Sequence, residues 1–278
     1  MSENLTEAVT DSVQHASSGG SDWIMHHIMD GNYLDFMPFF KVYLPQFELF
    51  GLNLSITRHV FFLWFVSILL FLIFYFASKG YKKSPVPKGF NNLLEILILF
   101  VRDEIAKPTI GKGYEKFVPY LLTAFFFILV SNFLGLIPFS ATITSNISIT
   151  AVLAIFSFGV IQLGGIKKNG FFGYFKGLIP HGVPVPLIPI MFIVEFIGLF
   201  TKPFALAVRL FANMTAGHIV IYALISLLFV MQTYLVAPLS IGMALFIYFL
   251  EILVALLQAY IFTMLSSLFI GMAVHLDH

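Results

Sequence analysis

The sequence contains no cysteine and unusually little charge. Charged residues make up 10% of its 278 positions, with 15 Lys or Arg against 14 Asp or Glu, whereas soluble domains contain about 25%. The absence of cysteine excludes disulfide bonds, thiolate nucleophiles and cysteine-ligated metals. The net charge is only +1, so the composition gives no basis for a nucleic-acid partner.

Basic residues are also missing from the N-terminal segment. Residues 1–40 contain six acidic residues, three histidines and no Lys or Arg. The cytoplasmic loops of membrane proteins carry an excess of Lys and Arg, so this segment is predicted to lie outside. We therefore expect residues 1–45 to form a polar extracytoplasmic extension and residues 46–278 to form one membrane domain.

Long apolar runs dominate the rest of the chain, since 59% of all residues are hydrophobic and 34 are Phe. A bilayer core of about 30 Å is crossed by about 20 apolar residues, and runs of this kind occupy residues 56–78, 117–137 and 148–165. Two further runs, 190–230 and 239–274, are too long for one upright span and are expected to tilt strongly. They are predicted to form a C-terminal hairpin.

The segments between these runs differ in charge and in proline content. Lysines follow the first and third spans, whereas the turn after the second span has no charge, so the lysine clusters and the C-terminus are predicted to be cytoplasmic. Residues 90–108 have apolar residues at helical spacing with Glu95, Arg102, Asp103 and Glu104 interspersed, which favours a helix at the membrane interface over a poor transmembrane helix. The proline-rich residues 177–190 indicate a loop or re-entrant connection.

These patterns together predict an all-α membrane protein. We expect about five membrane-embedded helices and one interfacial amphipathic helix, with the last two embedded helices long and strongly tilted.

One charged face stands out in the first long C-terminal run. Arg209 is one of three arginines in the chain, and at about 100° per residue Lys202, three alanines and Asn213 fall within about 60° of it. Small residues at this spacing let another helix approach closely, which would hold the guanidinium at a helix interface. Glu195, almost four turns earlier, shares this face if Pro203 leaves the helix intact, whereas His218 points the opposite way.

The second long run carries its own polar stripe. Ser240, Glu251 and Gln258 align within about 20° because their spacings are close to whole helical turns. A purely structural explanation is that the buried charges form interhelical ion pairs. The alternative explanation is that these charged residues are functional. A charge at the centre of a membrane helix costs at least about 2.5 kcal/mol, and such residues are functional by default. A set of Glu and His side chains suits a proton relay.

The sequence around Arg209 and Glu251 resembles that of a known protein family. The stretch "LAVRLFANMTAGHIV" at 206–220, preceded by "EFIGLFTKPFALAVRL" and followed by "EILVALLQAYIF" at 251–262, resembles subunit a of the F-type ATP synthase membrane sector. The resemblance extends in span order from about residue 56 to the C-terminus. It implies a bacterial inner (plasma) membrane location, with the C-terminal hairpin lying against a ring of subunit c and with peripheral-stalk subunit b as a further partner.

The resemblance also implies roles for particular residues. Arg209 corresponds to the essential coupling arginine, Asn213 to its helix neighbour and Gln258 to the glutamine that faces it. Glu195 corresponds to an access-channel carboxylate. His218 and Glu251 occupy two positions at which many relatives have the acid first and the histidine second, and the order in which the two accept a proton stays open.

The mechanism implied by the resemblance involves no bond chemistry in this chain, and neither a metal nor a cofactor is expected. Protons enter and leave by two offset aqueous half-channels, and the arginine couples their passage to rotation of the ring and so to ATP synthesis. Glu195, His218 and Glu251 are expected to line the outside-facing half-channel.

Two other classes of membrane protein fit the sequence less well. An ion-coupled secondary transporter would also have broken helices and buried charges, but it usually has paired interruptions in two related halves, whereas the proline-rich break occurs here once. An intramembrane hydrolase would need a nucleophile on a glycine-rich elbow, and no serine near a histidine has that context.

Overall fold

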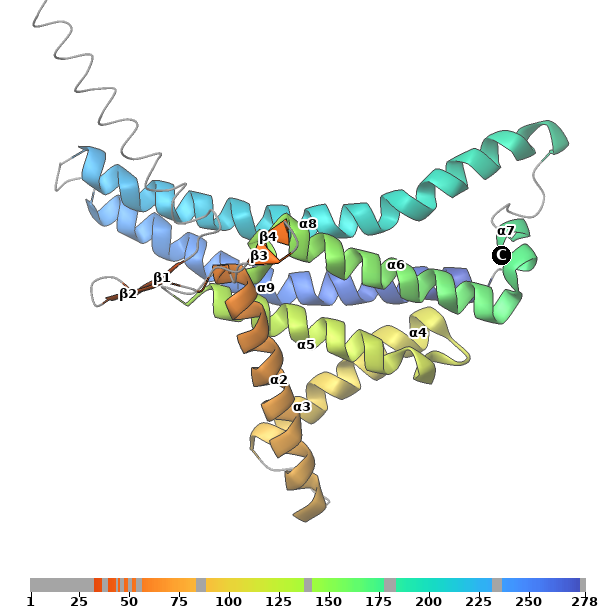
Figure 1. Cartoon of the computed structure of the whole chain (residues 1–278), viewed down its shortest axis with the longest axis horizontal. Coiled ribbons are helices and arrows are strands. Elements are labelled where there is room, and N and C mark those ends of the chain that lie inside the picture. The colour runs from red at the N-terminus through yellow and green to blue at the C-terminus, as the bar shows by residue number, and fades with distance from the viewer. Residues whose placement is uncertain are drawn as a thin grey trace, which may run out of the picture. The chain divides into compact units, whose positions relative to one another are not determined.

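The computed structural model of the chain describes residues 57–83, 89–137, 142–177, 184–231 and 237–275, together with short backbone segments between residues 33 and 53. Five of the described helices are long and apolar enough to cross a membrane (Figure 1). They are α2 (Arg58–Lys83), α5 (Val118–Gly135), α6 (Ile147–Asn169), α8 (Ile188–Met231) and α9 (Ala237–Val274). The predicted all-α membrane class with about five embedded helices is thereby confirmed.

The segment before α2 contains two short antiparallel hairpins that the sequence did not predict. Strands β1 (Tyr33–Phe36) and β2 (Phe40–Tyr43) form one hairpin, and β3 (Glu48–Leu49) and β4 (Leu52–Asn53) form the other. Residues 1–32 lie outside the described part of the chain. The predicted boundary at residue 45 and the predicted outside location of this segment therefore stay predictions.

The predicted helix at residues 90–108 is present and is not one of the candidate spans. It consists of α3 (Phe90–Leu99), the π-helical turn η1 (Phe100–Ala106) and α4 (Lys107–Ile110). Its apolar residues Val101 and Ile105 are fully buried. On the exposed side, Arg102 donates to Asp103 at 2.8 Å, and this hydrogen bond lowers the pKa of the Asp103 carboxyl. The helix is therefore amphipathic, as an interfacial helix must be.

The chain divides into two compact units, and both α8 and α9 contribute to each of them. The smaller unit contains residues 1–58 and 212–254, and the larger contains residues 59–211 and 255–278. Arg209, Glu195 and Gln258 thus belong to the larger unit, whereas His218 and Glu251 belong to the smaller.

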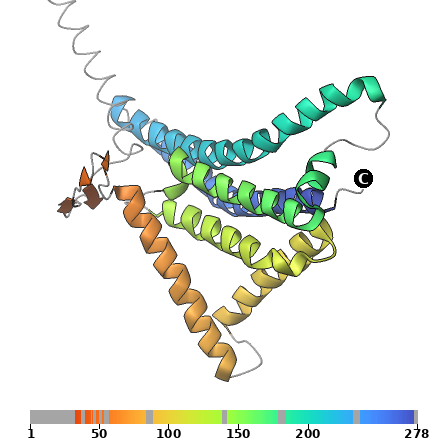
Figure 2. The ribbon, with the colours of Figure 1, turned by 45° about the vertical axis from the view of Figure 1, so that its right-hand side comes forward.

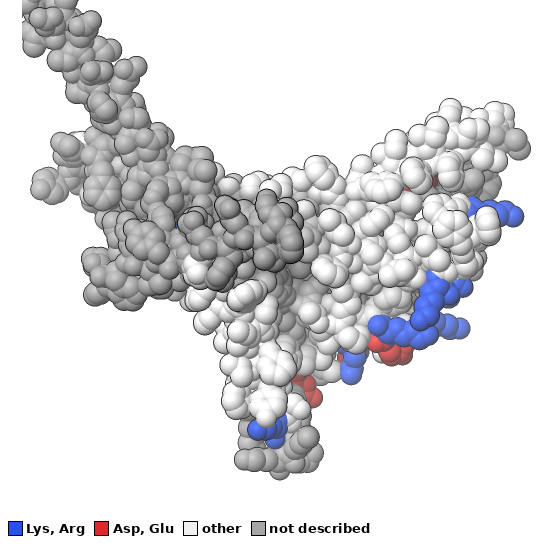
Figure 3. Space-filling model, viewed as in Figure 1, with Lys and Arg blue, Asp and Glu red and all other residues white. Residues whose placement is uncertain are grey.

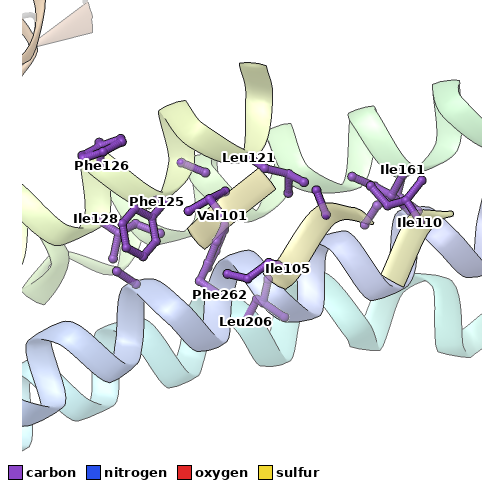
Figure 4. Close-up of a cluster of buried hydrophobic side chains, with 14 of the residues drawn as sticks. Val101, Ile105, Ile110, Leu121, Phe125, Phe126, Ile128, Ile161, Leu206 and Phe262 are labelled. Atoms are coloured by element: carbon purple, nitrogen blue, oxygen red, sulfur yellow. The ribbon is translucent and has the colours of Figure 1, made fainter. Parts of the chain in front are cut away.

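The core of the larger unit contains buried side chains from most of its helices. Side chains of η1, α5, α8 and α9 converge there, and Leu206 of α8 lies near Ile105 of η1 and Phe262 of α9 (Figure 4). Figures 1 and 2 show α5 and α6 beside the C-terminal part of α9, with the first turns of α8 diverging from them. Burial of Leu206 in this core fixes which face of α8 points outward.

The far end of α9 is held closely by its neighbours. Gly271 lies so near the Thr109 carbonyl that a Cβ at this position would collide with it, and the Thr109 and Ser267 hydroxyls are 2.5 Å apart. The Asn169 amide at the end of α6 donates to the carbonyls of Ala273 and Val274 at 3.1 and 3.3 Å. These bonds satisfy carbonyls that a helix leaves open at its C-terminus.

A short helix, α7 (Phe171–Lys176), follows α6 and was not predicted from the sequence. Gly170 separates the two helices with a φ of 72°, a left-handed conformation that favours glycine. Residues 178–183 of the predicted proline-rich connection lie outside the described residues, and α8 follows a 3₁₀ turn, Val185–Leu187. Figure 3 shows most Lys and Arg along one margin of the visible face, with Asp or Glu among them, while the rest of the described surface on this face is largely uncharged.

Candidate functional site

Helix α8 carries most of the predicted site residues and is unbroken. It runs for 44 residues, from Ile188 to Met231, and Pro203 lies inside it. A proline in a helix interior lacks the N–H for one hydrogen bond and crowds the preceding turn, yet the helix continues. The helical register between Glu195 and Arg209 is therefore retained, which is the condition for Glu195 to share the face of Arg209.

The face of α8 around Arg209 is exposed on the isolated chain. Arg209 is exposed, and so are the residues that helical spacing places beside it, namely Ala205, Ala212, Asn213 and Ala216. Among the residues that the structure describes, none forms a hydrogen bond or salt bridge with the Arg209 side chain. A permanently charged guanidinium thus lies on a small-residue surface, with no counter-charge from the described part of its own chain.

Another face of α8 anchors the helix. Leu206, Ala207, Leu210 and Met214 are buried, with exposed fractions of 3, 4, 0 and 1%. At about 100° per residue, the centre of this buried group is turned by roughly 100° or more from Arg209. The arginine therefore points away from its own core because the apolar residues beside it are held in that core.

Glu195 and Lys202 do not neutralise Arg209. Glu195 is half-buried, and within the described part of the chain it makes no hydrogen bond or salt bridge. The Lys202 ammonium lies 5.6 Å from the centre of the Phe269 ring on α9, a weak cation–π distance. Among the described residues, Glu195 and Arg209 are therefore not held in an ion pair with each other or with another charge.

His218 and Glu251 are the two predicted site residues that the structure joins. The His218 Nδ1 and the Glu251 Oε1 are 2.8 Å apart, and the side chains are 16% and 6% exposed. The other carboxylate oxygen, Oε2, is buried and has no hydrogen-bond partner among the described residues. The Tyr222 ring, one turn along α8, meets the imidazole edge-on at 6.3 Å between ring centres.

A glycine permits this acid–imidazole contact. A Cβ at Gly217 would overlap the Glu251 carboxylate, lying 2.8 Å from its Cδ and 2.9 Å from its Cγ. The carboxylate of α9 thus occupies the space that a side chain on α8 would fill. Sequence reasoning missed Gly217 because nothing along α8 indicates which side chain of α9 lies against it. Tyr222 was identifiable, since residues four apart share a helix face.

The two amide residues of the predicted site lie in different surroundings. Gln258 is 2% exposed and Ser240 and Glu251 are 3% and 5% exposed, so the predicted polar stripe of α9 is buried. Asn213, by contrast, is exposed on α8. The structure shows no hydrogen bond between Gln258 and Arg209, and the expected facing of these two residues stays a prediction.

Other buried polar pairs lie outside the predicted set. The Thr144 hydroxyl donates to the Asn132 Oδ1 at 2.7 Å, and the Asn132 amide donates to the Ala255 carbonyl at 3.4 Å. The hydroxyls of Ser157 and Ser266 are 3.0 Å apart. Because each group has a neutral partner, these contacts are interhelical hydrogen bonds of the kind that hold membrane helices together.

Known proteins match this sequence over most of its length. The ATP synthase A chain family matches residues 60–271. A protein named ATP synthase subunit a from Chloroherpeton thalassium is 56% identical over 258 residues, which cover 91% of this chain and 77% of the relative. One of the same name from Chlorobium phaeobacteroides is 50% identical over 262 residues, covering 93% and 77%. The chain therefore belongs to the ATP synthase A chain family and is a multi-pass bacterial membrane protein of the ATP synthase membrane sector.

Proposed function

We propose that the chain is the stator subunit that couples proton flow to rotation of a ring of carboxylate-bearing c subunits. The observation that carries the proposal is Arg209, which is exposed on the alanine-lined face of α8 and makes no hydrogen bond or salt bridge with the residues that the structure describes. The chain performs no bond chemistry of its own. Its contribution is electrostatic, and its partners are the c-ring, the peripheral-stalk subunit b and the lipid bilayer.

Arg209 acts on the ring carboxylate as each copy arrives. An arginine stays protonated in proteins, and a nearby opposite charge lowers a carboxyl pKa by about 1 to 3 units. The carboxylate therefore gives up its proton near Arg209. The flanking alanines permit the close helix approach that this interaction needs. Beyond Arg209 the carboxylate must take up a proton before it can face hydrocarbon, so the ring turns without a direct proton leak.

The two proton paths lie on opposite sides of Arg209 along α8. Glu195 precedes Arg209 by 14 residues, about 21 Å at 1.5 Å per residue, and His218 follows it by nine, about 14 Å. The outside-facing location that the sequence suggested for Glu195 fits this spacing poorly. Lys167, Lys168 and Lys176 precede the start of α8, so we assign Glu195 to the inside-facing path and the His218–Glu251 pair to the outside-facing path.

The His218–Glu251 pair carries protons inward. The His218 Nδ1 and the Glu251 Oε1 lie 2.8 Å apart, and an imidazole can bind and release protons near neutral pH. Asn213 and Gln258 cannot titrate, and they orient water or the ring carboxylate by hydrogen bonding. In this arrangement the N-terminus lies outside and the C-terminus lies in the cytoplasm, as the lysine distribution indicates.

We expect Arg209→Ala to abolish both ATP synthesis and ATP-driven proton pumping while the complex still assembles, because α8 is anchored through its other face. Arg209→Lys should be nearly as damaging. A desolvated ammonium can lose its proton, and it lacks the planar fork that binds a carboxylate. The measurement is ATP synthesis by membrane vesicles, normalised to the amount of assembled subunit a and ring.

A purely structural role for Arg209 predicts the opposite results for assembly and for activity. If this residue only holds helices together, its replacement should lower the amount of assembled complex, and the complexes that survive should work normally. Substantial synthesis per assembled Arg209→Ala complex would refute the proposed function.

The acid–imidazole pair is tested by exchanging its members. Glu251→Gln and His218→Leu should each slow proton entry about tenfold or more, since each removes a titrating group from the path. The double variant His218→Glu with Glu251→His should retain more activity than His218→Glu or Glu251→His alone, because coupled neighbours give non-additive effects. Proton uptake by vesicles per assembled complex is the readout, and strictly additive losses would argue against a shared path.

Gly217→Ala should slow proton entry less than the changes to His218 and Glu251 do, because it disturbs their contact without removing a polar group. The added methyl group must displace the Glu251 carboxylate, so proton entry should slow severalfold and overpacking should cost about 1–3 kcal/mol of stability. Gly242→Ala on α9 is the matched control, since a Cβ there meets nothing within 4 Å. Equal proton uptake by the two variants would show that Gly217 does not set the contact.

A further inference from the structure

Lys202 is a second cation on the same face of α8 as Arg209. It precedes Arg209 by seven residues, which is close to two full helical turns. The two side chains therefore leave the helix within about 20° of each other and about 10 Å apart along its axis. Glu195 precedes Lys202 by the same seven residues. Lys202 thus lies between the carboxylate that we assign to the inside-facing path and the coupling arginine.

The Lys202 ammonium is placed by contact with α9. It lies 5.6 Å from the centre of the Phe269 ring, and the side chain is half-buried. Among the described residues, none forms a salt bridge or a hydrogen bond with it. Helix α8 begins at Ile188, 14 residues before Lys202, so this is not a lysine at a helix end that extends its charge into water. The larger unit thus keeps a positive charge between α8 and α9 without neutralising it.

The elements packed against this part of α8 bring no charge that pairs with Lys202. The rings of Phe158 on α6 and Phe200 on α8 have centres 5.6 Å apart, and buried residues of α8, η1 and α9 share one core. The chargeable residues that these elements carry in the larger unit are Lys167 and Lys168 on α6, Tyr260 on α9, and Arg102, Asp103 and Glu104 on η1. Arg102 and Asp103 bind each other. Lys202 and Arg209 are therefore the positive charges that α8 contributes to this unit.

We propose that Lys202 promotes the release of a proton from each ring carboxyl into the inside-facing path, before that carboxyl reaches Arg209. This inference rests on the proposed function. Because α8 is expected to tilt strongly, a protonated ring carboxyl moves along it from the Glu195 end toward Arg209 during ATP synthesis. Near Lys202 the O–H bond of this carboxyl breaks, the proton passes to Glu195 and the inside, and the remaining carboxylate continues to Arg209. Lys202 neither gives nor takes a proton in this sequence.

The direction of the effect follows from charge attraction. A cation near a carboxyl group favours its ionised form, so the ring carboxyl loses its proton at a lower inside pH beside Lys202 than beside a neutral residue. In the reverse direction the same cation keeps the carboxylate ionised, and ATP-driven pumping then needs a higher inside proton concentration to refill it. Lys202 therefore favours synthesis over pumping when the inside pH is high.

The test measures the whole complex in vesicles in both directions while only the pH on the cytoplasmic side is varied. Lys202→Met should move the half-maximal pH upward by about one unit for ATP synthesis, which needs proton release, and equally for ATP-driven pumping, which needs proton uptake. Synthesis near neutral pH should slow severalfold, whereas pumping at alkaline pH should be faster than in the wild type. A residue that only packed the helices would not make pumping faster when replaced.

Two further variants separate the charge of Lys202 from its bulk and from the general charge of the inner surface. Lys202→Arg keeps the positive charge and should keep both wild-type pH profiles. Lys167→Met removes an exposed cation from the last turn of α6 and is the matched control, with no shift expected.

Unchanged profiles in Lys202→Met would overturn the inference, and so would shifts of equal size in Lys167→Met or slower pumping at every pH. Lys202→Gln provides a second neutral variant. If neither neutral variant assembles, Lys202 belongs to the fold, and the inference is also overturned. Arg209→Ala is measured in parallel: synthesis by that variant would defeat the proposed function itself, whereas inactive Arg209→Ala beside an unshifted Lys202→Met would defeat only the role of Lys202.

Discussion

The arrangement of this chain follows from one electrostatic constraint, which is that a guanidinium within a membrane protein stays charged and needs an anionic partner. Arg209 is exposed and makes no hydrogen bond or salt bridge with the described residues of its own chain. A charge of this kind facing hydrocarbon would cost several kcal/mol or more. No described residue of the chain supplies that partner, and under the proposed function a ring carboxylate supplies it in each step of rotation.

The rest of the larger unit keeps that charge pointing outward. Leu206 and Leu210 are buried, and Leu206 lies with Ile105 and Phe262 in a core shared by η1 and α9 (Figure 4). Rotation of α8 about its axis would pull these side chains out of the core. At about 1.5–3 kcal/mol for each large apolar side chain, this packing opposes such a rotation. Hydrophobic burial thus positions a charge that it does not touch.

Much of this structure could be predicted from the sequence, because hydropathy and helical periodicity are local signals. The five long helices and the small-residue face around Arg209 follow from residue spacing alone. The features that were missed depend on contacts between distant segments. Gly217 is needed because Glu251 of another helix occupies its side-chain space, and the π-helical turn η1 has no counterpart in residue periodicity.

The most direct test of the central claim is whether the Arg209 face meets the ring. The chain has no cysteine, so a single introduced cysteine reports one position. Ala212→Cys, on the Arg209 face, should form a disulfide in the assembled complex with a cysteine placed one turn from the ring carboxylate. Ile68→Cys on α2, which is 60% exposed, should not. Cross-linking from residue 68 and none from residue 212, in complexes that assemble normally, would contradict the account.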